Sequence, residues 1–343
     1  MNDQASILRR LLAESEAESS VGARPATSNG PTRASVGPAA ADRVDSERRG
    51  RVSFGPAAQR TAPRIEAPRL ARAIAVASGK GGVGKSNLAL NLSIELARRG
   101  RRIALFDADL GCANADVLCG LPVKATLADV VHGRRRLSEI MVRVPGIRGR
   151  GGVGLVPGAS GVTEVATLHA TQRQLLVEQL GALEKAVDLV LIDVGAGIAA
   201  DAVGFASAAD SVLLTCTPEP TAMTDAYAAA KAILVRRPDL DLSLIVNMAG
   251  SDDEGKAVHE RMDAVARRHL GRSIPLAGVV PFDFSVVGAV KRRKPLALAA
   301  PDARATVAIR RIAESLVEER PTTERSAPRQ GFLAGLLRTF TRD

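Results

Sequence analysis

Aromatic residues are scarce in this chain of 343 residues, which has seven Phe, one Tyr and no Trp. Proteins that hold single-stranded nucleic acid stack its bases on aromatic side chains, so the composition disfavours that class. No apolar run reaches the roughly 18–20 residues of a membrane-spanning helix. The first twenty residues carry Asp3 and several glutamates and lack a long apolar core, so we expect no signal peptide.

Cysteine and histidine are also rare. Cys112, Cys119 and Cys216 form no C-x-x-C pair, and the four histidines are scattered along the chain. These patterns predict neither a disulfide framework nor a metal site built from cysteine or histidine, and they fit a reducing cytoplasm.

Negative charge is in deficit, with 37 Asp and Glu against 47 Lys and Arg and a net charge of +10. This balance favours a negatively charged partner, either a membrane surface or DNA. A GC-rich genome also enriches arginine, so charge alone leaves both explanations open. A basic run at 291–294, K-R-R-K, lies near the end of a predicted helix. There we favour a solvated helix end, stabilised by the helix dipole, over DNA contact.

Residues 78–86, S-G-K-G-G-V-G-K-S, form the clearest motif. They follow an apolar run at 73–77 that predicts a buried strand. They precede residues 87–97, whose apolar side chains recur at helical spacing. A strand, a Gly-rich turn and a helix in this order indicate a phosphate-binding loop, because backbone N–H groups and the helix N-terminus converge on one point.

Lys85 would reach the outer phosphates, and the Ser86 hydroxyl would hold Mg²⁺. We expect the whole loop to contact the nucleotide. Its members are Gly79, Lys80, Gly81, Gly82, Val83, Gly84, Lys85, Ser86 and Asn87.

From residue 73 to about 318, apolar strand-like runs alternate with helical stretches. The predicted strands are 73–77, 102–106, 153–156, 187–192, 211–215, 242–246 and 277–280. This alternation predicts an α/β fold with a doubly wound, mostly parallel sheet and helices on both faces. Ligands bind at the C-terminal strand ends of such sheets, where the polar motifs of this chain occur.

The position of Lys80, directly after the first glycine, resembles the deviant Walker A loop of the MinD/ParA group of P-loop ATPases. The resemblance implies ATP as the nucleotide, Mg²⁺ as the metal and ATP hydrolysis as the reaction. It also implies an ATP-dependent homodimer, in which this lysine reaches the nucleotide of the other subunit. There it would act like an arginine finger, which stabilises the charge of the transition state.

Residues 107–116, D-A-D-L-G-C-A-N-A-D, resemble the switch I of that group, D-x-D-x-G-x-x-N-x-D. The match implies that Asp109 positions the attacking water and that Asp107 lies in the outer Mg²⁺ shell. Cys112 stands where Leu is usual in this stretch.

Residues 187–197 resemble Walker B and switch II, with Val194 where Thr is more usual. Asp193 would bind Mg²⁺ through water, and Gly195 would approach the γ-phosphate through its N–H. Asn247, Pro281 and Asp283 occupy places that contact adenine in MinD-like proteins, although all three also suit ordinary turns.

Residues 3–9, D-Q-A-S-I-L-R, resemble the D-Q-A-x-x-L-R activator motif of the FlhG group, also called FleN or YlxH. In that group the segment binds the signal-recognition-type GTPase FlhF and stimulates its GTP hydrolysis. The residues matched are Asp3, Gln4, Ala5, Leu8 and Arg9. The stretch 219–227, E-P-T-A-M-T-D-A-Y, also matches this group, and Thr221 or Thr224 is expected to cap the helix that follows.

Residues 331–343 predict an amphipathic helix after a polar linker. Its apolar face consists of Phe332, Leu333, Leu336, Leu337 and Phe340. This pattern indicates a membrane-surface helix and resembles the C-terminal membrane-targeting segment of MinD and FlhG. The alternative is that the segment docks onto its own ATPase domain.

We therefore predict an activator helix at 1–20, a disordered linker at 21–72, an ATPase domain at 73–318, a second linker at 319–330 and the amphipathic helix at 331–343. The resemblance implies a membrane-associated ATPase switch that regulates flagellar number and placement. It would act at the inner surface of the cytoplasmic membrane, including the cell poles.

Flagellar switch-complex components or a transcription regulator are further partners that the resemblance admits. The alternatives are a MinD-like division-site protein and a ParA-type partition protein, although DNA is the less favoured partner. Iron–sulfur carriers with the same loop need closely paired cysteines, which this chain lacks.

Overall fold

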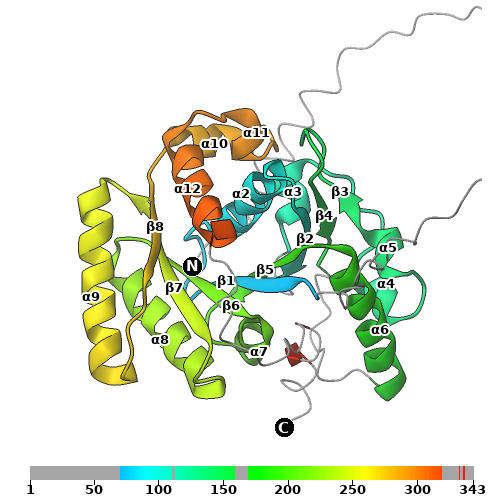
Figure 1. The fold of residues 1–343 in the computed structure, drawn as a ribbon, viewed down its shortest axis with the longest axis horizontal. Coiled ribbons are helices and arrows are strands. Elements are labelled where there is room, and N and C mark those ends of the chain that lie inside the picture. Colours follow the sequence, from blue (N-terminus) through cyan, green and yellow to red (C-terminus); the bar gives the residue numbers. More distant parts are fainter. Residues whose placement is uncertain (1–69, 110–112, 159–168, 319–331, 333–334, 337–343) are drawn as a thin grey trace, which may run out of the picture. The chain divides into compact units, whose positions relative to one another are not determined.

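The computed structural model describes residues 70–109, 113–158, 169–318, 332, 335 and 336 (Figure 1). These residues form one eight-stranded sheet in the order β3-β4-β2-β5-β1-β6-β7-β8. Its strands are β1 (Arg72–Ser78), β2 (Arg102–Ala108), β3 (Val142–Arg143), β4 (Gly152–Val156), β5 (Leu189–Ala196), β6 (Ser211–Cys216), β7 (Asp241–Ala249) and β8 (Leu276–Pro281). All strand pairs are parallel except β3–β4.

The mostly parallel, doubly wound α/β sheet predicted from the sequence is confirmed, and each of the seven predicted strands is present. The prediction missed β3, which pairs antiparallel with β4 at the sheet edge. A strand of two residues is too short to show any alternation of polar and apolar side chains.

Helices cover both faces of the sheet (Figure 1). One face packs against α2 (Lys85–Arg98), α3 (Ala115–Cys119), α10 (Phe284–Lys291), α11 (Leu296–Ala299) and α12 (Arg304–Glu318). The other packs against α4 (Leu127–Val131), α5 (Leu137–Ile140), α6 (Ala170–Ala186), α7 (Ala200–Ala208), α8 (Pro220–Arg236) and α9 (Asp252–Leu270). Because water reaches neither face, the central strands consist of nearly continuous apolar residues. Within the described part of the chain, no helix is both long and apolar enough to traverse a bilayer.

The strand register places the functional residues at one edge. Asp107 of β2 is paired with Asp193 of β5, and Asp193 is paired with Val76 of β1. Two residues beyond Val76, β1 ends at Ser78 and the glycine-rich loop begins. The two carboxylates and the loop therefore meet at the C-terminal ends of three adjacent strands, where doubly wound sheets bind ligands.

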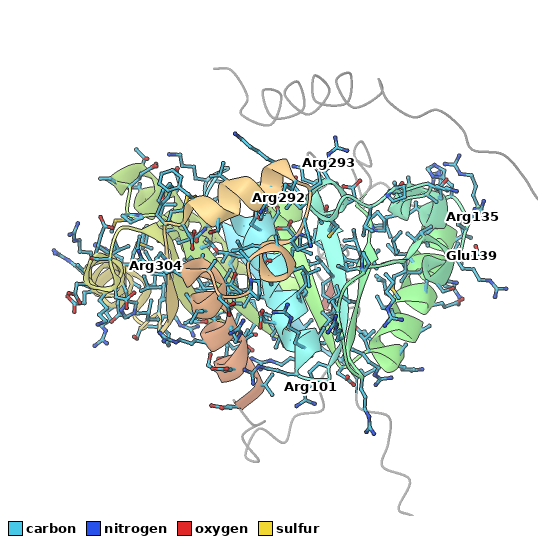
Figure 2. The ribbon with its side chains drawn as sticks, turned by 90° about the horizontal axis from the view of Figure 1, so that it is seen from above. Arg101, Arg135, Glu139, Arg292, Arg293 and Arg304 are labelled. Carbon is cyan, nitrogen blue, oxygen red and sulfur yellow. The ribbon has the colours of Figure 1, made fainter. Side chains whose placement is uncertain are left out.

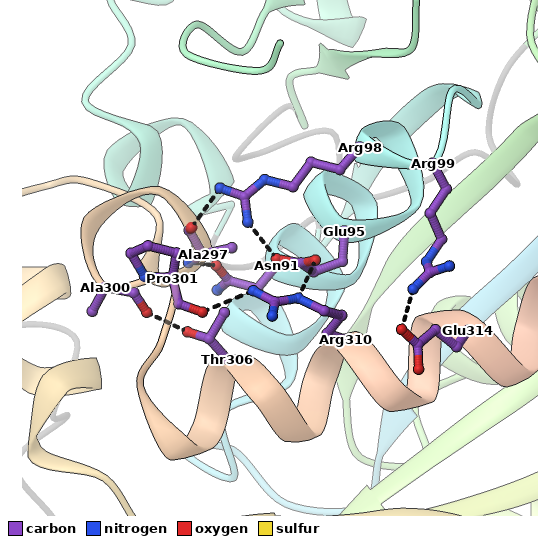
Figure 3. Close-up of polar contacts among 10 residues, drawn as sticks. All are labelled: Asn91, Glu95, Arg98, Arg99, Ala297, Ala300, Pro301, Thr306, Arg310 and Glu314. Carbon is purple, nitrogen blue, oxygen red and sulfur yellow. Dashed lines mark hydrogen bonds and ion pairs between the residues drawn. The ribbon is translucent and has the colours of Figure 1, made fainter. Parts of the chain in front are cut away.

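A network of polar side chains joins α2 to α12 beside the sheet (Figure 3). Glu95 of α2 is almost fully buried and accepts hydrogen bonds from Arg98 at 2.7 Å and Arg310 at 3.1 Å. Arg310 also donates to the carbonyl oxygen of Pro301 at 2.8 Å. One turn farther along the same helix contact, the exposed Arg99 pairs with Glu314. The buried carboxylate thus holds two helices that are more than two hundred residues apart in the sequence.

Replacement of Glu95 tests how much this network stabilises the fold. We expect Glu95→Gln to lower the free energy of unfolding by about 2 kcal/mol, because it removes the charge shared by two guanidinium groups from a buried position. The matched variant is Glu314→Gln, whose carboxylate is 40% exposed. It should lose less than about 0.5 kcal/mol. Urea denaturation of both variants measures the difference, and equal losses would contradict a role for burial.

Candidate active site

The glycine-rich loop is shaped by close approaches of its backbone to neighbouring segments. A Cβ atom at Gly79 would collide with the carbonyl group of Asp225 in α8, and one at Gly84 would collide with the side-chain amide of Asn247. Gly82 and Gly84 also have φ values of 83° and 85°, in the left-handed region that glycine adopts without strain. Only glycine therefore fits at Gly79 and Gly84, whereas a Cβ at Gly81 would meet open space.

Helix α2 begins at Lys85, and its N-cap residue is Gly84, which has no side chain to accept a hydrogen bond. The first N–H groups of a helix have no partner within the helix, and they carry partial positive charge. The loop therefore presents the donors that a phosphate group needs.

Lys85 is buried among carboxylates. Its ammonium group lies 3.0 Å from Oδ1 of Asp193 and 3.8 Å from Oδ2 of Asp109, and the side chain is 7% exposed. The other oxygen of Asp193, Oδ2, is buried and has no hydrogen-bond partner among the described residues. A buried carboxylate oxygen without a donor is rare in folded proteins, which makes Oδ2 a candidate ligand position. The Ser86 side chain also donates a hydrogen bond to the Asp193 carboxylate, which opposes the rise in its pKa that burial causes.

Asp107 completes the group of carboxylates. Its Oδ2 accepts hydrogen bonds from the N–H groups of Asn114 and Ala115, both at 3.1 Å, and its Oδ1 accepts one from Asp109 at 3.2 Å. Burial, followed by the charge of Asp193, raises the pKa of Asp107 to about 7. Burial also raises the pKa of Asp193, and the charge of Lys85 opposes that rise. Asp193 and Asp109 lie within 4 Å of the Lys85 ammonium, and Asp107 feels the charge of Asp193. A bound cation would relieve the repulsion between these carboxylates.

The residues fit a magnesium ion of the kind that P-loop proteins bind. Among the described residues, no group of three or more His, Cys, Asp or Glu side chains could enclose a metal by itself. Mg²⁺ retains several waters and takes few protein ligands when it binds together with phosphate oxygens. Ser86 would supply the direct ligand, and Asp193 and Asp107 would hold the waters.

Lys80 has different partners. Its ammonium group lies 2.9 Å from Oε2 of Glu219 and 3.2 Å from the hydroxyl oxygen of Thr221, at the start of α8. Both members of the ion pair are substantially exposed, Lys80 at 39% and Glu219 at 64%. The two lysines of the loop therefore pair with different acids. Lys85 pairs with Asp193 in the buried site, and Lys80 pairs with Glu219 near the surface.

The prediction that Thr221 or Thr224 caps α8 is wrong. The N-cap is Glu219, followed by Pro220 at the first helical position, and the Thr224 hydroxyl donates to the carbonyl of Pro220. Sequence reasoning also missed Glu219 as the partner of Lys80. The available signal was an acid directly before proline at a helix start.

Two of the residues expected to contact adenine, Asn247 and Asp283, make hydrogen bonds within the chain. Asn247 is buried, and its amide donates to the carbonyl oxygen of Val83 at 2.7 Å, so it fixes the loop. The Asp283 carboxylate accepts from the N–H of Ser285 at 2.8 Å and from that of Ala305 at 3.2 Å. These bonds make Asp283 the N-cap of α10, and the adenine contacts expected of Pro281 and Asp283 stay a prediction. Gly195 lies beside the site, where a Cβ would be 3.7 Å from Oδ1 of Asp109. Asn87 lies in the first turn of α2, where its carbonyl oxygen accepts a hydrogen bond from Asn91.

The expected partner-binding residues Asp3, Gln4, Ala5, Leu8 and Arg9 lie outside the described residues. So do Leu333, Leu337 and Phe340 of the expected membrane face. The other two members of that face are buried in the core, with Phe332 1% exposed and Leu336 3% exposed. The ring of Phe332 packs edge-on against Phe106 of β2, with 6.2 Å between ring centroids.

Known proteins are similar to this chain in sequence and in fold. Residues 74–296 match the family described as the CobQ/CobB/MinD/ParA nucleotide binding domain. The chain is 39% identical over 243 residues to the antiactivator FleN of Pseudomonas aeruginosa, covering 71% of this chain and 85% of FleN. It is 34% identical over 261 residues to the flagellum site-determining protein YlxH of Helicobacter pylori, covering 76% of this chain and 86% of YlxH.

Among solved structures, the septum site-determining protein MinD from Pyrococcus horikoshii, complexed with Mg-ADP, superposes with a TM-score of 0.59 at 26% identity. The superposition covers 72% of this chain and 96% of MinD. The family match and the identity to FleN and YlxH are consistent with the loop and the paired aspartates of the structure. The chain belongs to the MinD/ParA family of P-loop ATPases, within the FlhG group that includes FleN and YlxH.

Proposed function

We propose that this ATPase is a dimer-forming molecular switch in the control of flagella, with ATP and Mg²⁺ at the site of Lys85, Ser86, Asp107 and Asp193. The observation that carries the proposal is the separation of the two loop lysines. Lys85 is buried with Asp193, whereas Lys80 is paired near the surface with Glu219. An exposed ion pair contributes about 0–1 kcal/mol. Lys80 can therefore leave Glu219 at little cost and reach a nucleotide held by a second subunit.

Each residue then has a defined task. The N–H groups at the start of α2 and the ammonium of Lys85 bind the phosphates, and Asp109 orients the attacking water. Mg²⁺ supplies neutralisation of the charge on the outer phosphates. Lys80 of the second subunit adds positive charge where the transition state needs it, so hydrolysis and dimerisation depend on the same residue.

Substitution of each lysine separates these tasks. Lys85→Ala should weaken ATP binding roughly 100-fold, which corresponds to about 3 kcal/mol for a lost charged hydrogen bond. Lys80→Ala should bind ATP within about threefold of the unmodified chain and yet remain monomeric with ATP. Calorimetry measures the first effect and size-exclusion chromatography with light scattering the second. A Lys80→Ala chain that still dimerises with ATP would count against the mechanism.

We propose that membrane association uses residues 331–343. Phe332 and Leu336 are buried in the single chain, so their contact with lipid requires that they first leave the core. A dimer would offer two such segments and gain avidity from their linkage.

Removal of residues 331–343 tests this part of the proposal. We expect the ATP-dependent sedimentation of the chain with anionic liposomes to be lost, because the amphipathic face is the main source of apolar contact. ATP binding, measured on the same preparation, serves as the control and should stay unchanged. Unchanged liposome sedimentation would exclude the segment as the anchor.

The flagellar assignment rests on similarity to FleN and YlxH and on the D-Q-A-x-x-L-R match at residues 3–9. We propose that residues 1–20 stimulate a GTPase of the FlhF type. If residues 1–20 have no effect on that GTPase, a division-site or DNA-partition role would be favoured over the flagellar one.

The test is GTP turnover by the cognate FlhF-type GTPase with the full chain added. Turnover should rise severalfold, and Gln4→Ala should abolish the rise, because the motif would act through its polar side chains. The matched control is Gln59→Ala, which alters a glutamine in the predicted linker outside the motif. Equal stimulation by the Gln4→Ala chain would separate the motif from the effect.

A further inference from the structure

A cavity outside the phosphate-binding site lies at the C-terminal end of α2. It has a volume of about 450 Å³ and is lined where α2, α3 and α10 end, by Arg98, Cys119, Arg292, Arg293, Lys294 and Leu298 among others. Four of its lining residues are cationic and none is acidic. Helix α2 has 14 residues with Lys85 first and Arg98 last, so its two ends are about 20 Å apart. The cavity is therefore separate from the site of Lys85.

One of these cations is held in place. Arg98 donates to Glu95 at 2.7 Å and to the carbonyl oxygen of Ala297 at 2.8 Å (Figure 3). Glu95 also accepts from Arg310, so one carboxylate is shared by two guanidinium groups and positive charge remains at the cavity wall. A guanidinium fixed in this way needs no further ordering to meet a ligand.

The other cations come from the segment after α10. Figure 2 shows Arg292 and Arg293 at the end of that helix. No hydrogen bond or ion pair links the side chains of Arg292 and Lys294 to any other residue that the structure describes. Arg293 has a φ of 49°, a left-handed conformation for which glycine or asparagine is preferred at the end of a helix. Its carbonyl oxygen lies so near Gly120 that a Cβ there would be only 2.9 Å away.

Stabilisation of helix ends explains part of this charge. Cations are favourable in the last turn of a helix, and the exposed Lys291 already provides one for α10. Stabilisation of the helix end does not explain why three more cationic residues follow Lys291 around a cavity. The wall also has an apolar part, which includes Leu298 and the Cys119 thiol, whose pKa burial raises to about 12. That thiol is neutral at physiological pH and leaves the positive charge undiminished.

We propose that this cavity is a binding site for a phosphorylated ligand, with Arg98, Arg292, Arg293 and Lys294 around the phosphate and the apolar wall against the rest of the molecule. Guanidinium groups bind phosphate through paired charged hydrogen bonds. The volume falls within the range of about 300–1,000 Å³ that small-molecule sites occupy. Both a soluble phosphate compound and a lipid headgroup carry this chemistry.

The first arm of the test uses a soluble probe. The full chain, with its loop saturated by Mg-ADP, is titrated calorimetrically with sodium tripolyphosphate. We expect saturable binding of one equivalent, weakened about tenfold by Arg292→Ala and by Lys294→Ala. Lys291→Ala is the matched control, because Lys291 is cationic, exposed and adjacent but does not line the cavity. Binding that disappears in the presence of Mg-ADP belongs to the loop and would overturn the proposal.

The second arm replaces the probe with vesicles of phosphatidylcholine containing phosphatidylglycerol, with pure phosphatidylcholine as reference. Loss of binding in Arg292→Ala and Lys294→Ala, with Lys291→Ala unaffected, supports the site in either arm, and the arm that shows the loss identifies the source of the phosphate. Binding that the two cavity variants leave unchanged in both arms overturns the proposal. An equal loss of binding in Lys291→Ala would also overturn it, because it indicates a diffuse basic face. The same holds if the chain binds duplex DNA and all three substitutions weaken that binding equally.

Discussion

The buried ion pair between Lys85 and Asp193 is the interaction on which the active site depends. Both side chains are almost fully enclosed, and an unpaired charge in such a place would cost several kcal/mol. The pairing of Asp107 with Asp193 across β2 and β5 brings a second carboxylate to the same point, and burial raises its pKa to about 7. In the proposed function, a nucleotide with Mg²⁺ would supply one partner for each member of the pair. The phosphates would bind the lysine, and the cation would bind the carboxylates through water.

The same loop contains a second lysine in the opposite situation. Lys80 is two residues from Ser78, the last residue of β1, and is exposed enough for water to weaken its pairing with Glu219. The two lysine side chains therefore differ in burial and in how firmly they are held. Lys85 cannot leave without uncovering Asp193, whereas Lys80 can exchange partners. The role proposed for Lys80 on another subunit needs this freedom, whereas the role proposed for Lys85 in the nucleotide site needs a fixed position.

Local features were predictable from the sequence. The strand at 73–77, the glycine turn and the helix after it are contiguous, so their order alone indicates the phosphate-binding loop. The structure adds what depends on register and on distant segments. The pairing of Asp107 with Asp193, the partner of Lys80 at a separation of 139 residues, and a cavity lined from Arg98 to Leu298 all require three-dimensional contacts. The two-residue strand β3 carries too few side chains to show a period.

The C-terminal segment shows why periodicity alone does not identify an environment. Phe332 and Leu336 were predicted on one apolar face, and the structure places both against its own core beside Phe106. Burial of such a side chain contributes about 1.5–3 kcal/mol, and a lipid interface offers the same side chains a comparable gain. Any membrane contact of these residues must therefore exceed the contacts that they already make. The proposed membrane contact therefore needs a further gain, and the avidity of two segments linked in a dimer would supply one.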